Sequence, residues 1–381
     1  MKRLFVALLA LLATATLSAQ KALPTIIDIA SWEAGVSTAG HIQGIAVDTQ
    51  RGYIYVSFTT LLVKLDMEGN ILGSVTGLLG HLGCLDFNEE DGRIYGSLEY
   101  KNDAIGRHIL KQEGVTKEVE DRFYIAIFDG EKITRKGMNA ERDEVMTTVH
   151  LGTVLADYKA TVPTEKGRNT PHRWGCSGID GVSFGPSFNG KGGNMLTVAY
   201  GIYGDRDRSD NDYQVLLQYD TRKWNRYESA LSQDNAHTNG PVKPNGRYFV
   251  YTGNTRYGVQ NLEYDKNRNL WFLAVYKGKK PQFANYSLFV VDGTVKASKG
   301  TLLGCEYQHK GNLLHLAEMG HIDPRNPEIR GWHEKLGVFG ICALGNDLFY
   351  LASGKKNPQG QTATLRLVRF IGSDKAWEEV R

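Results

Sequence analysis

The chain lacks long hydrophobic runs beyond its N-terminus and carries almost no excess of charge. No stretch after residue 19 is apolar enough to cross a bilayer, so we expect no membrane span. The formal net charge is +3 with both signs interspersed, which argues against a nucleic-acid partner. No segment rich in proline or serine divides the 381 residues, so we expect one large domain.

Cysteine and proline are also scarce. The four cysteines (Cys84, Cys176, Cys305 and Cys342) allow at most two disulfides, and their spacings match no tight metal motif. Cys84 and Cys342 lie in apolar strand starts, which favours free buried thiols over disulfides. Only 10 prolines stand against 43 glycines and 19 tyrosines, a balance typical of many short strands joined by glycine turns.

The N-terminus has the pattern of a secretory signal peptide. Lys2 and Arg3 precede an apolar run over residues 4–13, and small residues lead to Ala19. We expect cleavage after Ala19, so residues 1–19 are left out of the fold. No cysteine follows that would carry a lipid anchor. The mature protein is therefore expected to be exported, periplasmic or extracellular, and monomeric.

A motif of two short strands occurs twice in the first hundred residues. Residues 40–47 contain the first strand and residues 52–58 the second. The pattern returns forty residues later at 80–87 and 92–98, with glycine, a histidine and alternating apolar positions in register. Repeats of this length, built from short strands and tight turns, are typical of β-propeller blades.

Weaker copies of the motif follow at 178–184, 258–265 and 337–343. A third strand follows in every unit, and four of these five strands end in an aspartate that can cap a turn. The sequence therefore predicts an all-β, five-bladed β-propeller with four-stranded antiparallel blades. Segments 236–251 and 302–316 resemble partial copies, so six or seven blades remain an alternative.

Residues 20–381 are expected to form this single propeller domain. Thr25–Trp32 precedes the first blade, and pairing with the last blade would close the ring and remove an exposed sheet edge. Long loops on a rigid scaffold often cover a rim and carry function. The expected insertions lie near 101–121, 138–173, 232–257 and 301–336.

Residues 41–75 resemble the NHL and SMP-30/gluconolactonase type of propeller, through the first motif copy and the Val63–Asn70 segment that follows it. The resemblance implies a propeller fold and, for enzymes of the SMP-30 type, a divalent metal held in the channel by Glu, Asn and Asp. Only Asp180 and Asn261 are of the right type here, and His41–Gly44 stands where the first Glu would be. The resemblance therefore does not supply a complete metal site.

Polar residues occupy the starts of the five innermost strands, which a propeller gathers at one mouth of its channel. Two histidines beside a carboxylate suit metal binding or acid–base chemistry, because imidazole titrates near neutral pH. His41, His81 and Asp180 are therefore the candidate catalytic residues. The alternative is that these side chains only satisfy strand ends and channel water. The expected ring comprises His41, Gln43, His81, Asp180, Gln260 and Asn261, with His237 and Asn239 joining from the 236–251 segment.

Two further groups are candidates. His172, Arg173 and Trp174 precede the third motif copy and would form a rim for stacking on a sugar or nucleobase, or would simply pack a loop. The second group spaces acids like the start of a calcium loop, without its central glycine and closing glutamate. This weak calcium candidate consists of Asp205, Asp207 and Asp210.

The leading hypothesis is an exported propeller that binds a small polar ligand, for example a carbohydrate-derived one, at the channel mouth. A polar ring of His, Gln and Asn without an acidic cage favours this hypothesis over a bare cation. One alternative is a hydrolase or lyase that uses the channel histidines, with or without a divalent cation such as calcium. Another is a protein-interaction scaffold in which the insertion over 101–121 forms the interface.

Overall fold

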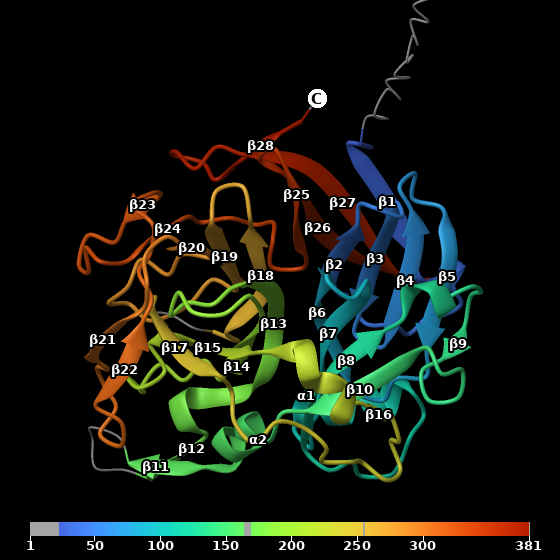
Figure 1. Cartoon of the computed structure of the whole chain (residues 1–381), viewed down its shortest axis with the longest axis horizontal. Coiled ribbons are helices and arrows are strands. Elements are labelled where there is room, and N and C mark those ends of the chain that lie inside the picture. The colour runs from blue at the N-terminus through green and yellow to red at the C-terminus, as the bar shows by residue number, and fades with distance from the viewer. Residues whose placement is uncertain (1–22, 164–168, 254–255, 381) are drawn as a thin grey trace, which may run out of the picture.

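The computed structural model describes residues 23–163, 169–253 and 256–380. Five antiparallel sheets follow one another around a central axis, and the chain passes through them in sequence order (Figure 1). The prediction of an all-β, five-bladed propeller is confirmed, and the six- and seven-bladed alternatives are excluded. No helix in the described ranges is long and apolar enough to span a membrane.

Each blade begins with an innermost strand that contains one copy of the motif. Blades 1, 2, 3 and 5 have four main strands, whereas blade 4 has three and completes its outer edge with isolated bridges from Leu316 and Trp332. From the axis outward, blade 1 consists of β2 (Ile42–Asp48), β3 (Tyr53–Phe58), β4 (Leu61–Asp66) and β5 (Ile71–Thr76), and blade 2 consists of β6 (His81–Asn88), β7 (Arg93–Tyr100), β8 (Arg122–Phe128) and β10 (Met146–His150). Blade 3 consists of β13 (Cys176–Pro186), β14 (Asn194–Ile202), β15 (Tyr213–Tyr219) and β17 (Gly246–Tyr251), and blade 4 of β18 (Val259–Asp265), β19 (Leu270–Val275) and β20 (Leu288–Asp292). Blade 5 consists of β25 (Ile341–Gly345), β26 (Leu348–Asn357), β27 (Gly360–Phe370) and β1 (Ile26–Ala30).

The ring closes as expected, because β1 from the N-terminal side supplies the outer strand of blade 5. Residues Ile26 to Ala30 pair antiparallel with Arg366 to Thr362 of β27. This pairing covers the edge that β27 would otherwise expose and ties the two ends of the described chain together. The first and last blades therefore lie side by side (Figure 1).

The segments that resembled extra copies are outer strands of blade 3. The segment over 236–251 ends in β17, and the 302–316 segment contributes β22 (Lys310–Leu313), which runs parallel to β17. Further short elements decorate the ring. They are β9 (Met138–Asn139), β11 (Thr161–Pro163), β12 (Asn169–Pro171), β16 (Ser229–Ala230), β21 (Ser298–Thr301), β23 (His321–Ile322), β24 (Arg330–Gly331), β28 (Trp377–Glu379), α1 (Ala104–Gln112), α2 (Gly152–Lys159), η1 (Ser31–Ala34), η2 (Gly130–Lys132), η3 (Arg173–Gly175) and η4 (Thr221–Arg226).

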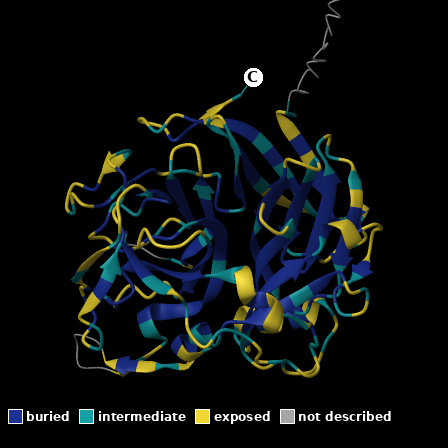
Figure 2. Ribbon diagram, viewed as in Figure 1, coloured by how far each residue is buried: buried dark blue, intermediate teal, exposed yellow. Residues whose placement is uncertain are grey.

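The hydrophobic core lies between neighbouring blades, where alternating strand residues of facing sheets interdigitate. Strands are mostly buried, and exposed residues concentrate in the loops around the ring (Figure 2). Aromatic side chains fill much of this space, and Trp271, Tyr55 and Phe123 are among the largest fully buried ones. The high tyrosine and low proline content of the sequence thus serves the packing of sheets against each other.

Aspartates at the ends of the third strands cap turns, as predicted. The Asp66 carboxylate accepts backbone amides of residues 68 and 70, and Asp129, Asp220 and Asp292 accept the amide two residues ahead. These carboxylates are therefore committed to the turns that lead into the outer part of each blade.

Candidate functional site

Two side chains close the central channel. Asn261 of β18 donates both amide hydrogens across the axis, to the carbonyl oxygens of Gln43 and Val338, at 2.9 Å each. The Cys84 thiol of β6 donates to the Val182 carbonyl at 3.4 Å. Both residues are almost completely buried. We call this pair the plug, because it separates one mouth of the channel from the other.

The other three blades leave no side chain at the equivalent positions, because the motif has glycine there. A Cβ on Gly44 would lie 2.6 Å from the Leu85 nitrogen and 2.8 Å from the Cys84 Cα. A Cβ on Gly340 would lie 2.8 Å from that of Ala352. Five strands converge so closely at this level that only two side chains fit between them. The five copies therefore differ at this position, with glycine in three and a larger residue in two, because of the packing at the axis.

A cavity of about 370 Å³ lies at the mouth where the innermost strands begin. Residues from all five blades line it, together with helix α1 from the 101–121 insertion. Asp103 caps the start of α1 by accepting the amides of Ile105 and Gly106. Gly106 sits against the Lys101 carbonyl, where a Cβ would clash. The insertion therefore forms part of the wall of the mouth.

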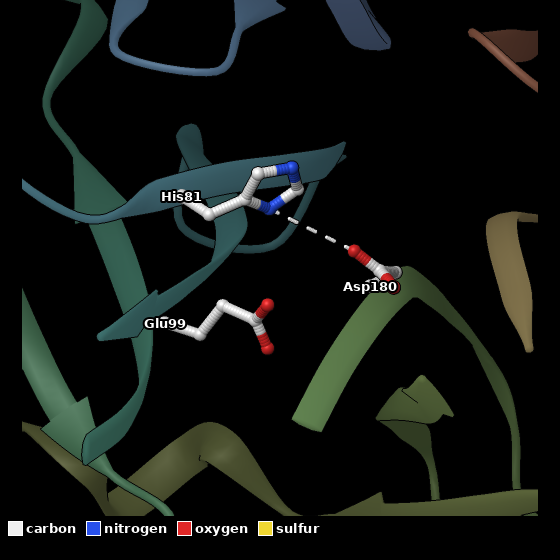
Figure 3. Close-up of side chains that lie close together, drawn as sticks. All are labelled: His81, Glu99 and Asp180. Carbon is white, nitrogen blue, oxygen red and sulfur yellow. Dashed lines mark ion pairs between the residues drawn. The ribbon is translucent and has the colours of Figure 1, made fainter. Parts of the chain in front are cut away.

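The centre of this cavity holds two carboxylates and an imidazole (Figure 3). The Nδ1 atom of His81 lies 3.8 Å from Oδ1 of Asp180, and the Gln260 amide donates to Oδ2 of Asp180 at 3.0 Å. Glu99 is paired with His81 in the β6–β7 ladder, so its carboxylate enters from the neighbouring strand. Burial, and then the charge of Glu99, raise the pKa of Asp180 well above its usual range. The ionised form of Asp180 is thus disfavoured relative to that of an aspartate in water.

Lys101, which also lines the cavity, neutralises the charge of Glu99. Its ammonium contacts Oε1 of Glu99, donates to the Ser177 carbonyl at 2.9 Å and lies 3.8 Å from Asp103. Both Lys101 and Glu99 are buried, at 5% and 4% exposure. Burial alone would lower the pKa of Lys101, but the carboxylates of Glu99 and Asp103 outweigh it and raise it. The pair is therefore a buried ion pair that holds blades 2 and 3 together at the mouth.

His81 is neutral at physiological pH. Burial lowers its pKa to about 3, and the positive charge of Lys101 adds to the effect. The Gln43 side-chain amide lies 2.9 Å from Nε2 of His81 and 3.2 Å from Nε2 of His41. With that amide as donor, the His81 proton is on Nδ1 and faces Asp180. A histidine with so low a pKa is a poor general base near neutral pH.

The three ligand atoms of His81, Glu99 and Asp180 lie within 4.8 Å of one another, a spacing that a metal ion could bridge. Both oxygens of Glu99 are already committed, however, one to Lys101 and the other to the Ile179 amide at 3.1 Å. A dication would sit next to the Lys101 ammonium, which is unfavourable for two positive charges in a buried site. The residues of this mouth do not fit a divalent metal in the observed arrangement.

An aromatic wall borders one side of the cavity. The Tyr257 and Tyr276 rings meet edge-on at 5.5 Å, and both residues line the cavity. Phe339 lies behind them, 6.0 Å from the Tyr276 ring and 5.5 Å from the His41 ring. Tyr257 is 41% exposed and has a positive φ of 65°, a backbone conformation that is costly for an aromatic residue. The wall gives the mouth a face on which a flat apolar surface can stack.

The structure brings together five of the residues that the sequence grouped at the mouth, namely His41, Gln43, His81, Asp180 and Gln260. Asn261 belongs to the plug and does not line this cavity. The proposed metal pair of Asp180 and Asn261 is therefore not formed.

His237 and Asn239 do not reach the mouth. His237 Nε2 lies 2.7 Å from the Thr148 hydroxyl, and the Asn239 amide donates to the Ser229 hydroxyl at 2.8 Å. Both residues pack along β10, the outer strand of blade 2, far out on the blade. Their apparent match to the motif fails because the segment before β17 lies outside the innermost layer.

The predicted rim and the calcium candidate also serve other roles. Trp174 is fully buried in the core, Arg173 pairs with Asp157, and the His172 ring lies between Tyr158 and Tyr203. None of the three lines the cavity.

In the acidic loop, Asp210 is buried and both its oxygens accept hydrogen bonds from the Arg208 guanidinium, at 2.8 and 2.7 Å. Asp205 accepts the amide of Asp207. The Arg208 guanidinium already engages both oxygens of Asp210, so this carboxylate is not available as a calcium ligand.

Sequence reasoning missed the residues that enter from the ends of the second strands. Glu99 is the last but one residue of β7, and Thr59, Lys101 and Tyr276 directly follow β3, β7 and β19; all four line the cavity. In an antiparallel pair the end of one strand lies beside the start of its neighbour. Aligning the ends of the second strands, as well as the starts of the first, would have found them.

A scan against family models finds no match, and no curated protein is similar in sequence. Among solved structures, a GH43_1 enzyme from Xanthomonas citri complexed with xylose is 10% identical over 90% of this chain and 92% of its own, with a TM-score of 0.39. A GH43 β-1,3-galactosidase with galactodeoxynojirimycin is 11% identical over 91% and 99%, with a TM-score of 0.40. A Bacteroides caccae protein of unknown function is 10% identical over 73% and 86%, with a TM-score of 0.31.

Proposed function

We propose that the channel mouth binds a small polar, carbohydrate-derived ligand. The observation that carries the proposal is the combination of polar groups from every blade with the aromatic wall around one cavity of about 370 Å³. That volume is at the lower end of the range for small-molecule sites. The plug closes the floor, so a ligand would enter and leave by the same opening.

The polar groups of the cavity match a polyol. Gln43, Gln260 and Asp180 together offer amide donors and carboxyl oxygens on neighbouring strands. A hydroxyl-rich ligand can exchange hydrogen bonds with such neutral groups without burying a charge. The Tyr257 and Tyr276 rings provide the apolar surface that the face of a sugar ring needs.

Ligand-induced thermal stabilisation tests the proposal. The purified protein is screened against sugars, amino sugars and sugar acids, and any hit is repeated with His41→Ala and Gln260→Ala. A ligand at 100 times its Kd stabilises by about 2.7 kcal/mol, which raises the Tm by about 3 °C in a chain of this size. Both variants are expected to lose the shift. His309→Ala, a change at an exposed histidine outside the cavity, is the control and should keep it.

Equal shifts in the wild type, His41→Ala and Gln260→Ala would place the ligand elsewhere and contradict the site. No shift with any member of the library would contradict the carbohydrate class.

A hydrolase is the second candidate, favoured by the raised pKa of Asp180 close to the Glu99 carboxylate, which Lys101 pairs. A neutral carboxyl group beside an ionised one is the arrangement that general acid catalysis at a glycosidic oxygen requires. In this role Asp180, and not a histidine, would donate the proton. Turnover of a bound sugar that disappears in Asp180→Asn, with binding retained, would establish the enzyme; binding without turnover would leave the protein a binder.

We propose further that the protein is exported and acts as a monomer in the periplasm or outside the cell. The basic start and apolar run of residues 1–19, which lie outside the described residues, support export. Membership of the NHL and SMP-30/gluconolactonase type is likewise a proposal, supported by the motif in residues 41–75. Cell fractionation and N-terminal sequencing of the mature protein would test export.

A further inference from the structure

The channel has a second mouth, at the end where the innermost strands finish. A cavity of about 550 Å³ lies there, lined by the ends of β2, β6, β13, β18 and β25. The plug separates it from the ligand cavity. Five acidic side chains line this second mouth. Lys266 is the only basic residue among those that line it. The acids are Asp86, Glu89, Glu90, Glu263 and Asp265.

The one lysine does not neutralise the deeper acids. Lys266 is paired with Glu89 at 2.7 Å, and both side chains are exposed at the rim. Asp86, Glu263 and Asp265 belong to the innermost strands and lie deeper. No ion pair involves any of these three within the described chain. The floor of the second mouth therefore holds three carboxyl groups without an ion-pair partner among the described residues.

Two of these carboxylates each have an oxygen without a hydrogen-bond partner among the described residues. Glu263 is 5% exposed; its Oε1 accepts the Ala343 amide at 2.6 Å, and its Oε2 has no partner. Asp265 is 2% exposed; its Oδ1 accepts the Asn267 amide at 2.9 Å, and its Oδ2 has no partner. A buried carboxylate oxygen without a partner costs free energy, and such groups usually bind a cation or a donor.

The innermost strands bring these three carboxyl groups to the same mouth. Glu263 and Asp265 are two residues apart on β18, so both side chains lie on the same face of the strand. Asp86 lies on the other side of β13, and both of its oxygens accept backbone amides: Oδ1 that of Phe87 at 2.7 Å and Oδ2 that of Phe184 at 2.5 Å.

From this geometry we infer that the second mouth is a cation site, in which the unpartnered oxygens of Glu263 and Asp265 hold a divalent metal ion with Asp86 adding charge. Carboxylate and water oxygens are the ligands that hard dications such as Ca²⁺ prefer. The alternative way to satisfy the same groups is protonation, which would leave no affinity for cations. The inference concerns a different cavity from the proposed ligand site and stands or falls independently of it.

The test uses the full mature chain after dialysis against EDTA. Isothermal titration with CaCl₂, MgCl₂ and MnCl₂ measures affinity and stoichiometry, and the Tm is recorded in parallel. The wild type is expected to bind about one Ca²⁺ and to gain thermal stability. Glu263→Gln and Asp265→Asn should each weaken binding by about tenfold or more. Glu90→Gln removes an exposed charge from the same rim and should bind like the wild type.

Folding of the variants can be checked without metal. Glu263→Gln keeps the oxygen that accepts the Ala343 amide and removes a repelled charge, so its stability in EDTA should be no lower than that of the wild type. Three results would each overturn the inference: no heat and no Tm change with any of the cations, equal affinity of Glu263→Gln and the wild type, or loss of cation binding in Asp180→Asn, which would place the ion at the other mouth.

Discussion

Replacing Lys101 by methionine tests how the ligand mouth is held together. The change removes the ammonium that contacts Glu99 and keeps most of the side-chain length. Glu99 then stays buried without a counter-charge and next to Asp180, since its remaining bond is the one from the Ile179 amide. Removing one partner of a buried ion pair typically costs about 3–5 kcal/mol. That loss is a large share of the roughly 5–15 kcal/mol that stabilises a folded protein.

The loss in Lys101→Met is expected to depend on pH. Burial already raises the pKa of Glu99 in the wild type, and without Lys101 it rises further. The folded variant therefore keeps a proton on Glu99 over a pH range in which the unfolded chain has lost it. Stability then rises as the pH falls, by up to about 1.4 kcal/mol per pH unit within that range. The free energy of unfolding of Lys101→Met should therefore fall furthest below that of the wild type at pH 8, and less far at pH 5.

Urea unfolding of four proteins measures this effect: the wild type, Lys101→Met, Glu99→Gln and the double variant. A neutral pair of similar volume is often as stable as a buried ion pair, so the double variant should recover most of the loss. A loss below about 1 kcal/mol at pH 8 for Lys101→Met would refute the reasoning. The same would follow if Lys101→Met cost as much in the Glu99→Gln background as in the wild type.

Three further outcomes are expected. Gly44→Ala should lower the free energy of unfolding in urea by about 1–3 kcal/mol, because its Cβ would meet only backbone atoms at the plug. Gly193→Ala, in an open loop, is the control and should stay within about 0.5 kcal/mol of the wild type. Equal losses in the two variants would contradict the packing of the plug. His81 should destabilise the fold by about 1.6 kcal/mol between pH 6.5 and 5, since the unfolded chain gains part of a proton there and the folded site, with its pKa of about 3, does not. His81→Gln should therefore lose less stability on acidification, and an equal loss in both proteins would count against the neutral imidazole. All four cysteines should resist a thiol reagent in the native protein and react after unfolding, as their burial and lack of disulfides require.

The sequence predicted the architecture well because the propeller repeats one physical solution. Each innermost strand needs apolar residues on alternate positions, and each third strand needs a turn cap such as Asp66. These local requirements recur in every copy, so they are visible without any knowledge of tertiary contacts. Even the pairing of Thr25–Trp32 with the last blade follows from the general need to cover a sheet edge.

The candidate site was predictable only in part. His41, Gln43 and His81 were located because they lie within the repeat, whose position relative to the channel is fixed. Glu99 and Lys101 were missed because they lie at the end of the second strand, where the copies share no visible pattern. Loop residues such as His237 were placed wrongly, because no periodicity reports where a long loop crosses the ring.

The plug gives the unequal copies of the motif their physical meaning. Cys84 and Asn261 are the two residues that break the glycine pattern at the narrowest level, and their hydrogen bonds to Val182, Gln43 and Val338 link residues of all five blades. Because these bonds use backbone carbonyls, the closure does not depend on the side chains of either mouth. The two mouths can therefore differ in chemistry: the first neutralises its buried acid with Lys101 and adds an aromatic wall, while the second leaves its acids uncompensated. A continuous channel would allow water and ions to pass between them and would weaken both kinds of electrostatic environment.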